Sequence, residues 1–587
     1  MSEMVSAAQR PIQVRHRIFD ALTISDRVAN WIRWVARVWV VIATMVFLAL
    51  GLRDGVPTNP ELGNWQQPVQ LVLLFLVAIG GLIAWRWEAT GATVISFGAI
   101  FLGVLATVEN APQTAFLAAL VFLIPGVLFW FVWQRTKALK AVIALAVAMG
   151  VLLASGGYAS AYVYDYLFGP THPQSALEAP PIDQVEWIWS GAATDSSITV
   201  KAKLAHDNET VRLLVSESAD MANSTPANPI AVVNDERVVT FRIDGLEPDT
   251  RYYYAVEADG HLDLARQGQF RTFPDGAASF SFAFAACART DSNGLVFEAI
   301  RATDPLFYMN VGDLHYTYID EGDPDLFRAQ YDNVQAQPAQ AALYRSTPFV
   351  YLWDDHDYGP NNGDRTSPTR DAARQVYTEN APHYALAAPD EGIYQAFTVG
   401  RVRFILTDTR SQRDPGTDPD NADKSMLGEA QKAWLKQQLL DANGIYPVIV
   451  WVNTGPWIDA AGAGKDTWGG YATERRELAD FIVDNDIQGI VMLSGDAHSV
   501  AIDDGTNSDF STSGSDGFPV MHAAPLDKRG GIKGGPYSEG VFAESGQFGL
   551  VSVVDNGGAE VTVTLSGRNY RGEEIVSYTF TVTATGK

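Results

Sequence analysis

The sequence predicts a multidomain chain, with an N-terminal α-helical transmembrane bundle, a small β-sandwich and a C-terminal α/β sandwich. Three observations predict this order. Long apolar stretches fill residues 1–165, alternating apolar and polar residues mark 183–275, and short apolar runs that end in polar side chains recur in 276–587. Between the first two regions, residues 166–182 are rich in proline and small residues, which predicts an extended linker.

Five apolar stretches in the first region approach the length of about 20 residues that crosses a bilayer as a helix. They are residues 34–52, 69–87, 92–108, 115–133 and 141–163. No acidic or basic residue lies deep within any of them, whereas ion pathways commonly need such groups. The pattern therefore favours a multi-pass anchor over a transporter.

The basic residues of this region predict its orientation. Six arginines lie between residues 10 and 37, Arg86 lies in the second link, and three bases lie in 135–140. The other two links contain only Arg53. By the positive-inside rule, the N-terminus is cytoplasmic. Five spans then place the chain from residue 165 onward on the extracytoplasmic side of the cell (inner or plasma) membrane.

The charge of the chain is divided unequally along its length. Residues 1–170 carry 11 Lys and Arg against 8 Asp and Glu, whereas the remainder carries 31 against 60. Such an acidic C-terminal region argues against nucleic-acid binding, which requires basic residues to neutralise phosphates. The single cysteine, Cys287, excludes an intrachain disulfide.

Residues 183–275 predict a β-sandwich without catalytic groups. The segments ITVKAKL (198–204) and VVTFRI (238–243) alternate apolar and polar residues, as half-buried strands do. The run GLEPDTRYYYAV (245–256) resembles the tyrosine corner of fibronectin III-like sandwiches, in which a tyrosine hydroxyl fixes a crossover loop. We interpret this region as a spacer or a partner-contact module.

In the third region, polar side chains follow short apolar strands. Residues 282–286 are followed by Cys287, and residues 307–311 are followed by Asp313 and Tyr316. FVYLWDDHDYGPNN (349–362) and IVMLSGDAHS (490–499) repeat the arrangement. Because ligands bind beyond the carboxyl ends of parallel strands, these side chains should meet in one crevice. They predict a metal site, as in a metal-dependent hydrolase, although a lone cysteine is equally often a core residue.

Eight stretches in this region, taken in their order, resemble one family. They are AACARTDSNG, GDLHY, WDDHDYGPNN, GRVRFILTDTRSQR, MLGEAQKAWL, GPWIDAAGAGKDTWGGY, LSGDAHS and FPVMHAAPLD. Residues 280–545 are similar to the PhoD-like alkaline phosphatase/phosphodiesterase family, an offshoot of the calcineurin-like metallophosphoesterases. The resemblance implies a metallophosphoesterase sandwich for residues 276–587, which the alternating C-terminal strands would complete.

The resemblance also implies two kinds of metal ligand. An iron(III) ion would be held by Cys287, Asp313, Tyr316 and His498, and calcium by Asp313, Asn361 and Asp496. Thiolate and phenolate donors suit a transition metal, and hard oxygens suit calcium. The wider superfamily has histidines where this chain has Cys287 and Asp496, so a histidine-rich two-zinc site is not expected. Aligning WDDHD with the superfamily's Gly-Asn-His-Glu makes Asp355 the alternative to Asn361.

Several polar residues beside these ligands are candidates for catalysis. We expect a metal-bridging hydroxide to attack phosphorus, with His315 and Arg289 stabilising the phosphate oxygens and His356 protonating the leaving group. Each could instead be a hydrogen-bond partner of a ligand. Lys424, Trp468 and Tyr471 are candidates for the mouth of a substrate pocket, with core packing as the alternative.

Together these features predict a membrane-anchored extracytoplasmic enzyme that hydrolyses phosphomonoesters or phosphodiesters. A phospholipase D-like diesterase that acts on lipid headgroups is the nearest alternative, because the anchor holds the site near lipid. A non-catalytic membrane receptor that uses the fold as a scaffold is the alternative from another class.

Overall fold

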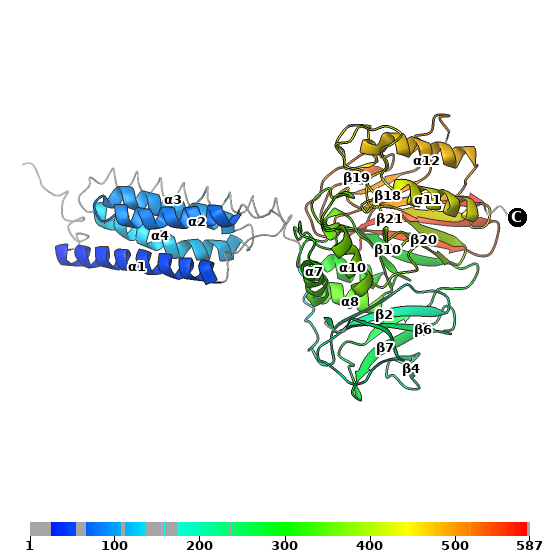
Figure 1. Cartoon of the computed structure of the whole chain (residues 1–587), viewed down its shortest axis with the longest axis horizontal. Coiled ribbons are helices and arrows are strands. Elements are labelled where there is room, and N and C mark those ends of the chain that lie inside the picture. Colours follow the sequence, from blue (N-terminus) through cyan, green and yellow to red (C-terminus); the bar gives the residue numbers. More distant parts are fainter. Residues whose placement is uncertain are drawn as a thin grey trace, which may run out of the picture. The chain divides into compact units, whose positions relative to one another are not determined.

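A computed structural model describes residues 25–53, 66–106, 112–134, 154, 158, 173–233, 236–515 and 517–583. The chain divides into two compact units, Met1–Leu167 and Phe168–Lys587 (Figure 1). The first is helical, and the second contains all of the described strands.

Four helices form the described part of the first unit. They are α1 (Asp26–Arg53), α2 (Gln66–Ile83), α3 (Glu88–Ala106) and α4 (Pro112–Gln134). They coincide with the first four predicted apolar stretches, and the fifth, 141–163, lies outside the described residues. Among the described residues, one segment, Glu88–Leu105, is a helix long and apolar enough to cross a membrane by length and composition. Val69–Ile83 and Ala119–Trp133 are shorter apolar helices.

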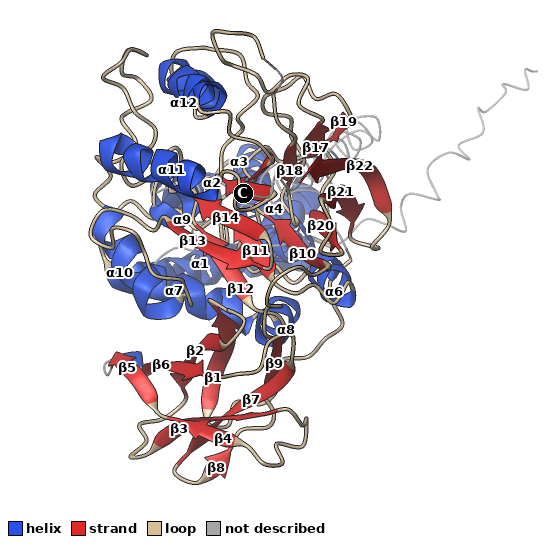
Figure 2. Cartoon of the chain, turned by 90° about the vertical axis from the view of Figure 1, so that its right-hand side faces the viewer, coloured by secondary structure: helices blue, strands red, loops and turns tan. Residues whose placement is uncertain are grey.

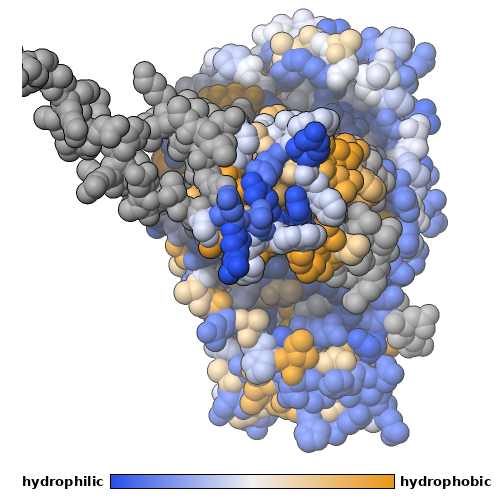
Figure 3. All heavy atoms as spheres, turned by 90° about the vertical axis from the view of Figure 1, so that its left-hand side faces the viewer, coloured by the Kyte–Doolittle hydropathy of each residue, from blue (hydrophilic) through white to orange (hydrophobic). Residues whose placement is uncertain are grey.

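Small residues allow these helices to pack closely. A Cβ on Gly91 of α3 would lie 2.3 Å from the backbone nitrogen of Ala84, and the side chain of Ala84 is fully buried. Close contact at small residues is typical of helix packing in membranes. Arg33 of α1 forms an ion pair with Glu88 of α3, so the starts of these two helices lie at the same end of the bundle. Figure 3 shows hydrophilic side chains gathered on one part of this unit and apolar ones beside them.

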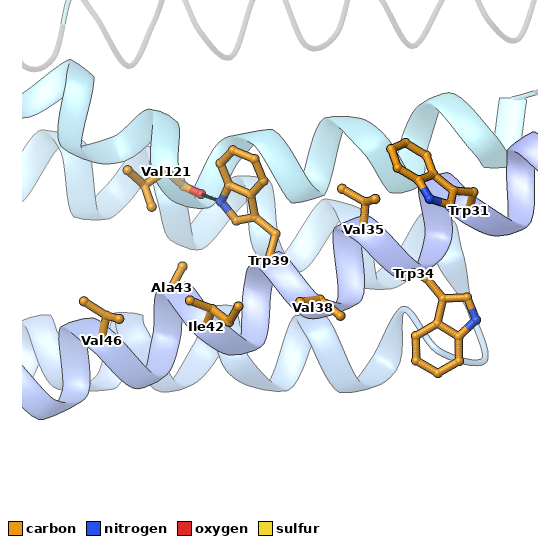
Figure 4. A pocket seen from close by; sticks show the side chains of 9 residues that line it. All are labelled: Trp31, Trp34, Val35, Val38, Trp39, Ile42, Ala43, Val46 and Val121. Carbon is orange, nitrogen blue, oxygen red and sulfur yellow. Dashed lines mark hydrogen bonds between the residues drawn. The ribbon is translucent and has the colours of Figure 1, made fainter.

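A groove on the surface of the helical unit is lined by apolar and aromatic side chains of α1 and by Val121 of α4 (Figure 4). It has a volume of about 660 Å³. The indole Nε1 of Trp39 donates a hydrogen bond to the carbonyl oxygen of Val121 at 2.9 Å. This bond fixes the position of α1 against α4.

The second unit is built on three β-sheets (Figure 2). The ten-stranded sheet has the order β22 (Glu574–Thr583), β21 (Glu560–Asn569), β20 (Gln547–Asp555), β10 (Phe280–Ala285), β11 (Tyr308–Val311), β12 (Phe349–Leu352), β1 (Val185–Gly191), β2 (Ser197–Leu204), β6 (Val238–Asp244) and β5 (Pro229–Val233). The seven-stranded sheet has the order β13 (Gln395–Val399), β14 (Val402–Leu406), β15 (Val448–Val452), β16 (Ile490–Ser494), β18 (Val520–Ala523), β17 (Val500–Asp503) and β19 (Gly540–Phe542).

These two sheets pack face to face through aromatic side chains. Phe282 of β10 meets Phe404 of β14 edge to face with ring centroids 5.3 Å apart, and Phe307 meets the same ring at 5.4 Å. Phe397 of β13 stacks on Phe404 at 4.6 Å. All four rings are buried. The predicted α/β sandwich is therefore present, and the three C-terminal strands complete its first sheet as expected.

Helices cover the outer surfaces of this sandwich. They are α6 (Leu295–Ala302), α7 (Pro324–Ala336), α8 (Pro338–Ser346), the short α9 (Asp355–Tyr358), α10 (Arg370–Asn380), α11 (Gly428–Ala442) and α12 (Ala472–Asp484), the last preceded by the 3₁₀ turn Trp468–Tyr471. Helix α8 contacts β1, and α11 contacts β14. This cover buries both faces of the parallel strands, which accounts for their continuous apolar sequences.

The predicted β-sandwich is joined to the larger sandwich through a common sheet. Strand β1 pairs in parallel with β12, so the ten-stranded sheet runs through both regions. The third sheet consists of β4 (Thr225–Ala227), β3 (Val211–Ser216), β7 (Arg251–Ala258) and β8 (His261–Leu262), with β9 (Gly268–Arg271) paired to β7. The hydroxyl of Tyr252 accepts a hydrogen bond from the Glu247 amide at 3.0 Å, which is the contact that a tyrosine corner makes.

Candidate active site

Strand ends from both large sheets meet at one site. Cys287 follows β10 and Asp313 follows β11, whereas His498 follows β16 of the other sheet. These three side chains offer ligand atoms that all lie within 4.8 Å of one another. The convergence that the sequence predicts is therefore observed, because the parallel strands place their carboxyl ends at the same edge of the sandwich.

A second group of ligand atoms adjoins the first and shares Asp313. Asp313, Asp354 and Asp355 also lie within 4.8 Å of one another, and the last two follow β12. A carboxylate that belongs to two adjacent ligand groups has the position required to bridge two cations.

The backbone at these positions is held in an unusual conformation. Cys287, Asp313, Asp496 and His498 have φ values of 64°, 55°, 48° and 52°. Left-handed backbone at residues other than glycine costs energy and clusters at functional sites. Hydrogen bonds keep it in place, since the Cys287 amide donates to the Gly312 carbonyl at 3.1 Å and the Ala288 amide to that of Asp313 at 2.8 Å.

Asp357, which the sequence analysis did not single out, fixes the ligand loops. Its carboxylate accepts hydrogen bonds from the amides of Asp313 at 2.6 Å, Leu314 at 2.7 Å and Asp354 at 3.0 Å. One buried carboxylate thus ties the loop after β11 to the loop after β12. The signal in the sequence was the third acid of the DDHD motif, which completes a capping box at the start of α9.

The tautomer of His498 follows from its contacts. Its Nδ1 lies 2.9 Å from the carbonyl oxygen of Arg529, which can only accept, so Nδ1 carries the proton. Its Nε2 then faces the hydroxyl of Tyr316, 2.7 Å away, with a lone pair. A histidine whose other nitrogen is fixed by a carbonyl is the usual form of a metal ligand.

Burial and nearby acidic groups raise the pKa of three candidate ligands, Asp313, Cys287 and Tyr316. Burial, then Asp355 and Asp354, raises the pKa of Asp313 well above its usual value. Burial, then Asp313, raises the pKa of the Cys287 thiol and of the Tyr316 phenol. A bound cation would reverse these shifts, because it favours the deprotonated ligands.

Buried oxygen atoms without partners indicate where cations fit. Among the described residues, Asp313 Oδ1, Asp354 Oδ2 and Asp496 Oδ2 are buried and accept no hydrogen bond. Buried polar atoms are normally paired, so these oxygens are suited to coordinate ions. Cys287 and Tyr316 lie beside them, with the Cys287 Sγ 3.5 Å from Asp313 Oδ2. The donor set therefore fits one site with thiolate, phenolate and imidazole ligands and another rich in oxygen.

Of the two residues proposed for the oxygen-rich site, the structure brings Asp355 to Asp313. The side chain of Asn361 is exposed, whereas Asp355 is buried, and its Oδ2 accepts from the Asn362 amide at 2.7 Å. The structure therefore favours Asp355 over Asn361 as a ligand of the oxygen-rich site. The physical reason is that β12 ends directly before the acids, whereas Asn361 lies beyond α9 on the surface.

An ion-pair network stands behind Asp354. The Arg410 guanidinium contacts Asp354 at 2.5 Å and Asp466 at 3.0 Å, and Arg413 also pairs with Asp466. Asp408 is not ion-paired in this network. Its carboxylate accepts hydrogen bonds from the indole of Trp353 at 3.0 Å and from the backbone amide of Arg410 at 2.9 Å. The network holds one oxygen of Asp354 and leaves the other for the site.

The three predicted catalytic residues have different surroundings. Burial lowers the pKa of His315 to about 3 and that of His356 to about 4, so both rings are neutral at neutral pH. The His356 ring lies 4.2 Å from that of Tyr316, and its Nδ1 has no partner among the described residues. Arg289 is paired with Asp527, because its amide donates to that carboxylate at 2.8 Å and its guanidinium lies 3.7 Å from it.

The residues predicted at the pocket mouth lie in the core instead. The Lys424 ammonium donates to the carbonyls of Gly416 and Gly470, both at 3.0 Å, and lies 4.3 Å from the centre of the Tyr471 ring. Trp468 and Tyr471 are fully buried, and their polar atoms bond to Asn453 and Asp414. The prediction that Lys424, Trp468 and Tyr471 contact substrate is corrected to core packing, because their polar groups are already satisfied internally.

Two lysines at the site were missed in the sequence. The Lys533 ammonium forms an ion pair with Asp496, and that of Lys528 lies 3.8 Å from the centre of the Tyr316 ring. Both belong to the segment DKRGGIKGGPY, in which one pair of glycines lies between the two lysines and another follows the second.

Two regions of the chain match known protein families. The PhoD-like phosphatase family matches residues 282–531, and a domain of unknown function (DUF7670) matches 25–141. Alkaline phosphatase D of Bacillus subtilis (strain 168) is 26% identical, over 54% of this chain and 63% of that protein. The chain thus spans somewhat less than two thirds of this curated relative.

Two solved structures that match this chain are more distant in sequence, and the first of them shares its fold. The structure of PhoD superposes with a TM-score of 0.55 at 18% identity, covering 70% of this chain and 92% of that one. Purple acid phosphatase PPD1 from yellow lupin (Lupinus luteus) seeds gives a TM-score of 0.49 at 12% identity, covering 67% and 73%.

Proposed function

We propose that this chain, whose residues 282–531 match the PhoD-like phosphatase family, is a membrane-anchored, metal-dependent phosphoesterase. It would hydrolyse phosphomonoesters, phosphodiesters or both. The observation that carries this proposal is the meeting of Cys287, Asp313 and His498 beside Asp354 and Asp355 at one edge of the sandwich.

We assign iron(III) to Cys287, Asp313, Tyr316 and His498, since a thiolate, a phenolate and an imidazole are suited to a transition metal. We assign calcium to the oxygens of Asp313, Asp355 and Asp496, with Asp354 beside them. When bound, these ions would supply a nucleophile from water at neutral pH and neutralise charge on the phosphate.

The protein's own groups would position the reaction. Asp357 holds the loops that carry Asp313 and Asp354, and the network around Arg410 fixes the orientation of Asp354. His356, neutral and with its ring beside that of Tyr316, has a nitrogen that can donate a hydrogen bond to a phosphate or leaving-group oxygen. Such fixed donors stabilise charge that develops in the transition state.

The membrane location is supported by the surface of the helical unit. Trp31 is 68% exposed, Ile42 56% and Met45 68%, all on one helix. Large apolar side chains at the surface of a helix are stable in lipid but costly in water. The charge pattern of the sequence supports an extracytoplasmic position for the catalytic unit.

The second candidate function is a diesterase that acts on lipid headgroups. A site tethered to a bilayer meets phospholipids at high local concentration, which favours this substrate class over a dissolved one. Both candidates use the same metal site, so only substrate choice separates them.

The experiment is hydrolysis by the purified full chain in detergent, with an aryl phosphomonoester, an aryl phosphodiester and a phosphatidyl ester as substrates. We expect turnover of an aryl ester that a chelator abolishes and that Cys287→Ala lowers strongly. Turnover of the phosphatidyl ester alone would favour the lipid diesterase. Absence of hydrolysis from a metal-loaded, folded chain would contradict the proposal and favour a non-catalytic receptor.

A further inference from the structure

One segment crosses the edge of the site and contacts several ligands. It runs from Asp527 to Tyr537, between β18 and β19, with the sequence DKRGGIKGGPY. We refer to it as the strap.

Both ends of the strap and its middle are tied to the catalytic unit. At the first end, Asp527 accepts from the amide of Arg289 and from the hydroxyl of Ser292. In the middle, the Arg529 carbonyl accepts from His498 Nδ1, and the Gly531 amide donates to the His498 carbonyl at 2.8 Å. The strap is therefore positioned by a metal-ligand residue itself.

At the other end, glycines let the strap approach the neighbouring loop. The Gly535 amide donates to the Ile458 carbonyl at 2.7 Å. Gly534 has a φ of +78°, and a Cβ there would lie 2.3 Å from the same carbonyl oxygen. Only glycine fits this contact, so the backbone between the two ends is fixed.

This fixed backbone directs two lysines into the site. The Lys533 side chain is 43% exposed along its length, yet its ammonium contacts the buried carboxylate of Asp496. The Lys528 ammonium lies over the ring of Tyr316, 3.8 Å from its centre. The two charges thus lie beside ligands from both groups, Tyr316 near the thiolate site and Asp496 near the oxygen-rich site.

Two arginines near the site are each paired with carboxylates. Arg289 faces Asp527, and Arg410 is enclosed by Asp354 and Asp466. The floor of the site carries several carboxylates, which repel a phosphate. A substrate with two negative charges would therefore require cationic side chains beside the ligands, as Lys528 and Lys533 are.

We propose that Lys528 and Lys533 bind the non-bridging oxygens of the substrate phosphate and make the site selective for dianionic phosphomonoesters over monoanionic phosphodiesters. This inference rests on the proposed function of the same site. An ammonium group gains more from a dianion than from a monoanion, because the Coulomb attraction scales with charge. Lysine is a common phosphate ligand for this reason.

The experiment compares Lys528→Gln and Lys533→Gln with the wild type, using the full chain in detergent. The measured quantities are kcat/KM for an aryl phosphomonoester and for the matching aryl phosphodiester, and the dissociation constant of inorganic phosphate from calorimetry. We expect each variant to lose about ten-fold or more on the monoester and on phosphate affinity, the effect of one charge-assisted hydrogen bond, and clearly less on the diester.

Two controls separate substrate binding from a structural role. Lys436→Gln removes an ion-paired lysine on the outer side of α11, where it pairs with Glu477 at 2.6 Å, and should change none of these quantities. Lys533→Arg keeps the charge and should recover a large part of the monoester activity. Elemental analysis of every variant verifies that the metal content is unchanged.

The results discriminate between the two proposals. Equal losses on both esters, or unchanged affinity for inorganic phosphate in both Gln variants, would overturn the role of the strap. A wild-type chain that hydrolyses neither ester would contradict the proposed function, and phosphate calorimetry, which needs no turnover, would still decide whether the strap lysines bind phosphate.

Discussion

The two units of this protein differ in where their charged and apolar side chains lie. In the helical unit, Arg33 and Glu88 form an ion pair whose side chains remain 25% and 20% exposed. In the catalytic unit, Arg410 and Asp354 form an ion pair in which both side chains are 1% exposed. The helical unit exposes large apolar side chains on its surface, whereas the catalytic unit buries a cluster of acids that includes Asp313, Asp354 and Asp355.

This difference reflects the free-energy cost of placing charged or apolar side chains in each environment. Buried charges are costly and persist where they are paired or hold cations. An exposed apolar helix surface is costly in water and favourable in lipid. The catalytic unit therefore concentrates its chemistry in buried charge, whereas the described core of the helical unit is apolar.

The largest effect is expected from the acid shared by both ligand groups. Asp313→Asn removes the charge that both cations need, so we expect loss of bound metal and at least an about hundred-fold fall in kcat/KM. Asp371→Asn is the matched control, because this acid is exposed and pairs only with Arg374 on α10. Retained metal and activity in Asp313→Asn would refute the assignment of the site.

The next effect tests the buried ion pair. Arg410→Met leaves Asp354 and Asp466 without their main partner, and we expect a loss of about 3–5 kcal/mol in the stability of the catalytic unit. Arg212→Met provides the comparison, since its pair with Glu257 is half exposed and should cost less than about 1 kcal/mol. Thermal unfolding followed by tryptophan fluorescence measures both, and equal losses would contradict the contrast.

A buried carboxyl outside the site gives a pH test. Burial raises the pKa of Glu474 from 4.5 to about 7, against hydrogen bonds from Ser425 and Met426. The folded state then binds the proton more tightly, so this contribution to stability is full below pH 4.5 and is lost as the pH rises through 7.

Glu474→Gln should remove this loss, so that between pH 4.5 and 7 the stability of the wild type falls relative to the variant by up to about 3 kcal/mol. Unfolding midpoints measured across this range test the prediction. A constant difference between the two proteins would show that Glu474 does not titrate as proposed.

The smallest effect is expected in the helical unit. Arg33→Gln removes the ion pair with Glu88, whose partly exposed position limits its value to less than about 1 kcal/mol. Thermal unfolding in detergent would measure this change. A loss as large as that of Arg410→Met would remove the distinction between the two units.

Much of the fold could be predicted because local patterns decide it. The strands before Cys287 and Asp313 are continuous apolar runs, and the tyrosine corner at Tyr252 follows from a motif in which one hydroxyl meets one nearby amide. The sheet that joins β1 to β12 was not predictable in this way, because the pairing is between residues far apart in sequence and depends on tertiary packing.

The candidate site was predicted for those ligands that follow strands directly. Asp355 and Asn361 lie in one motif, and only the position of the strand end and the turn of α9 distinguish the buried residue from the exposed one. Lys424 and Tyr471 were assigned to a pocket because charge and aromatic character suggest binding, whereas burial decides that they pack together. Lys533 reaches the site through a glycine-rich strap whose path no local pattern specifies.

The most direct test of the metal centre is elemental analysis with visible absorbance on the purified full chain and on Tyr316→Phe. We predict about one iron together with calcium per chain, and a tyrosinate-to-iron charge-transfer band that disappears in Tyr316→Phe. Zinc or manganese alone, in a colourless protein that Tyr316→Phe leaves unchanged, would contradict the iron site built from Cys287, Asp313, Tyr316 and His498.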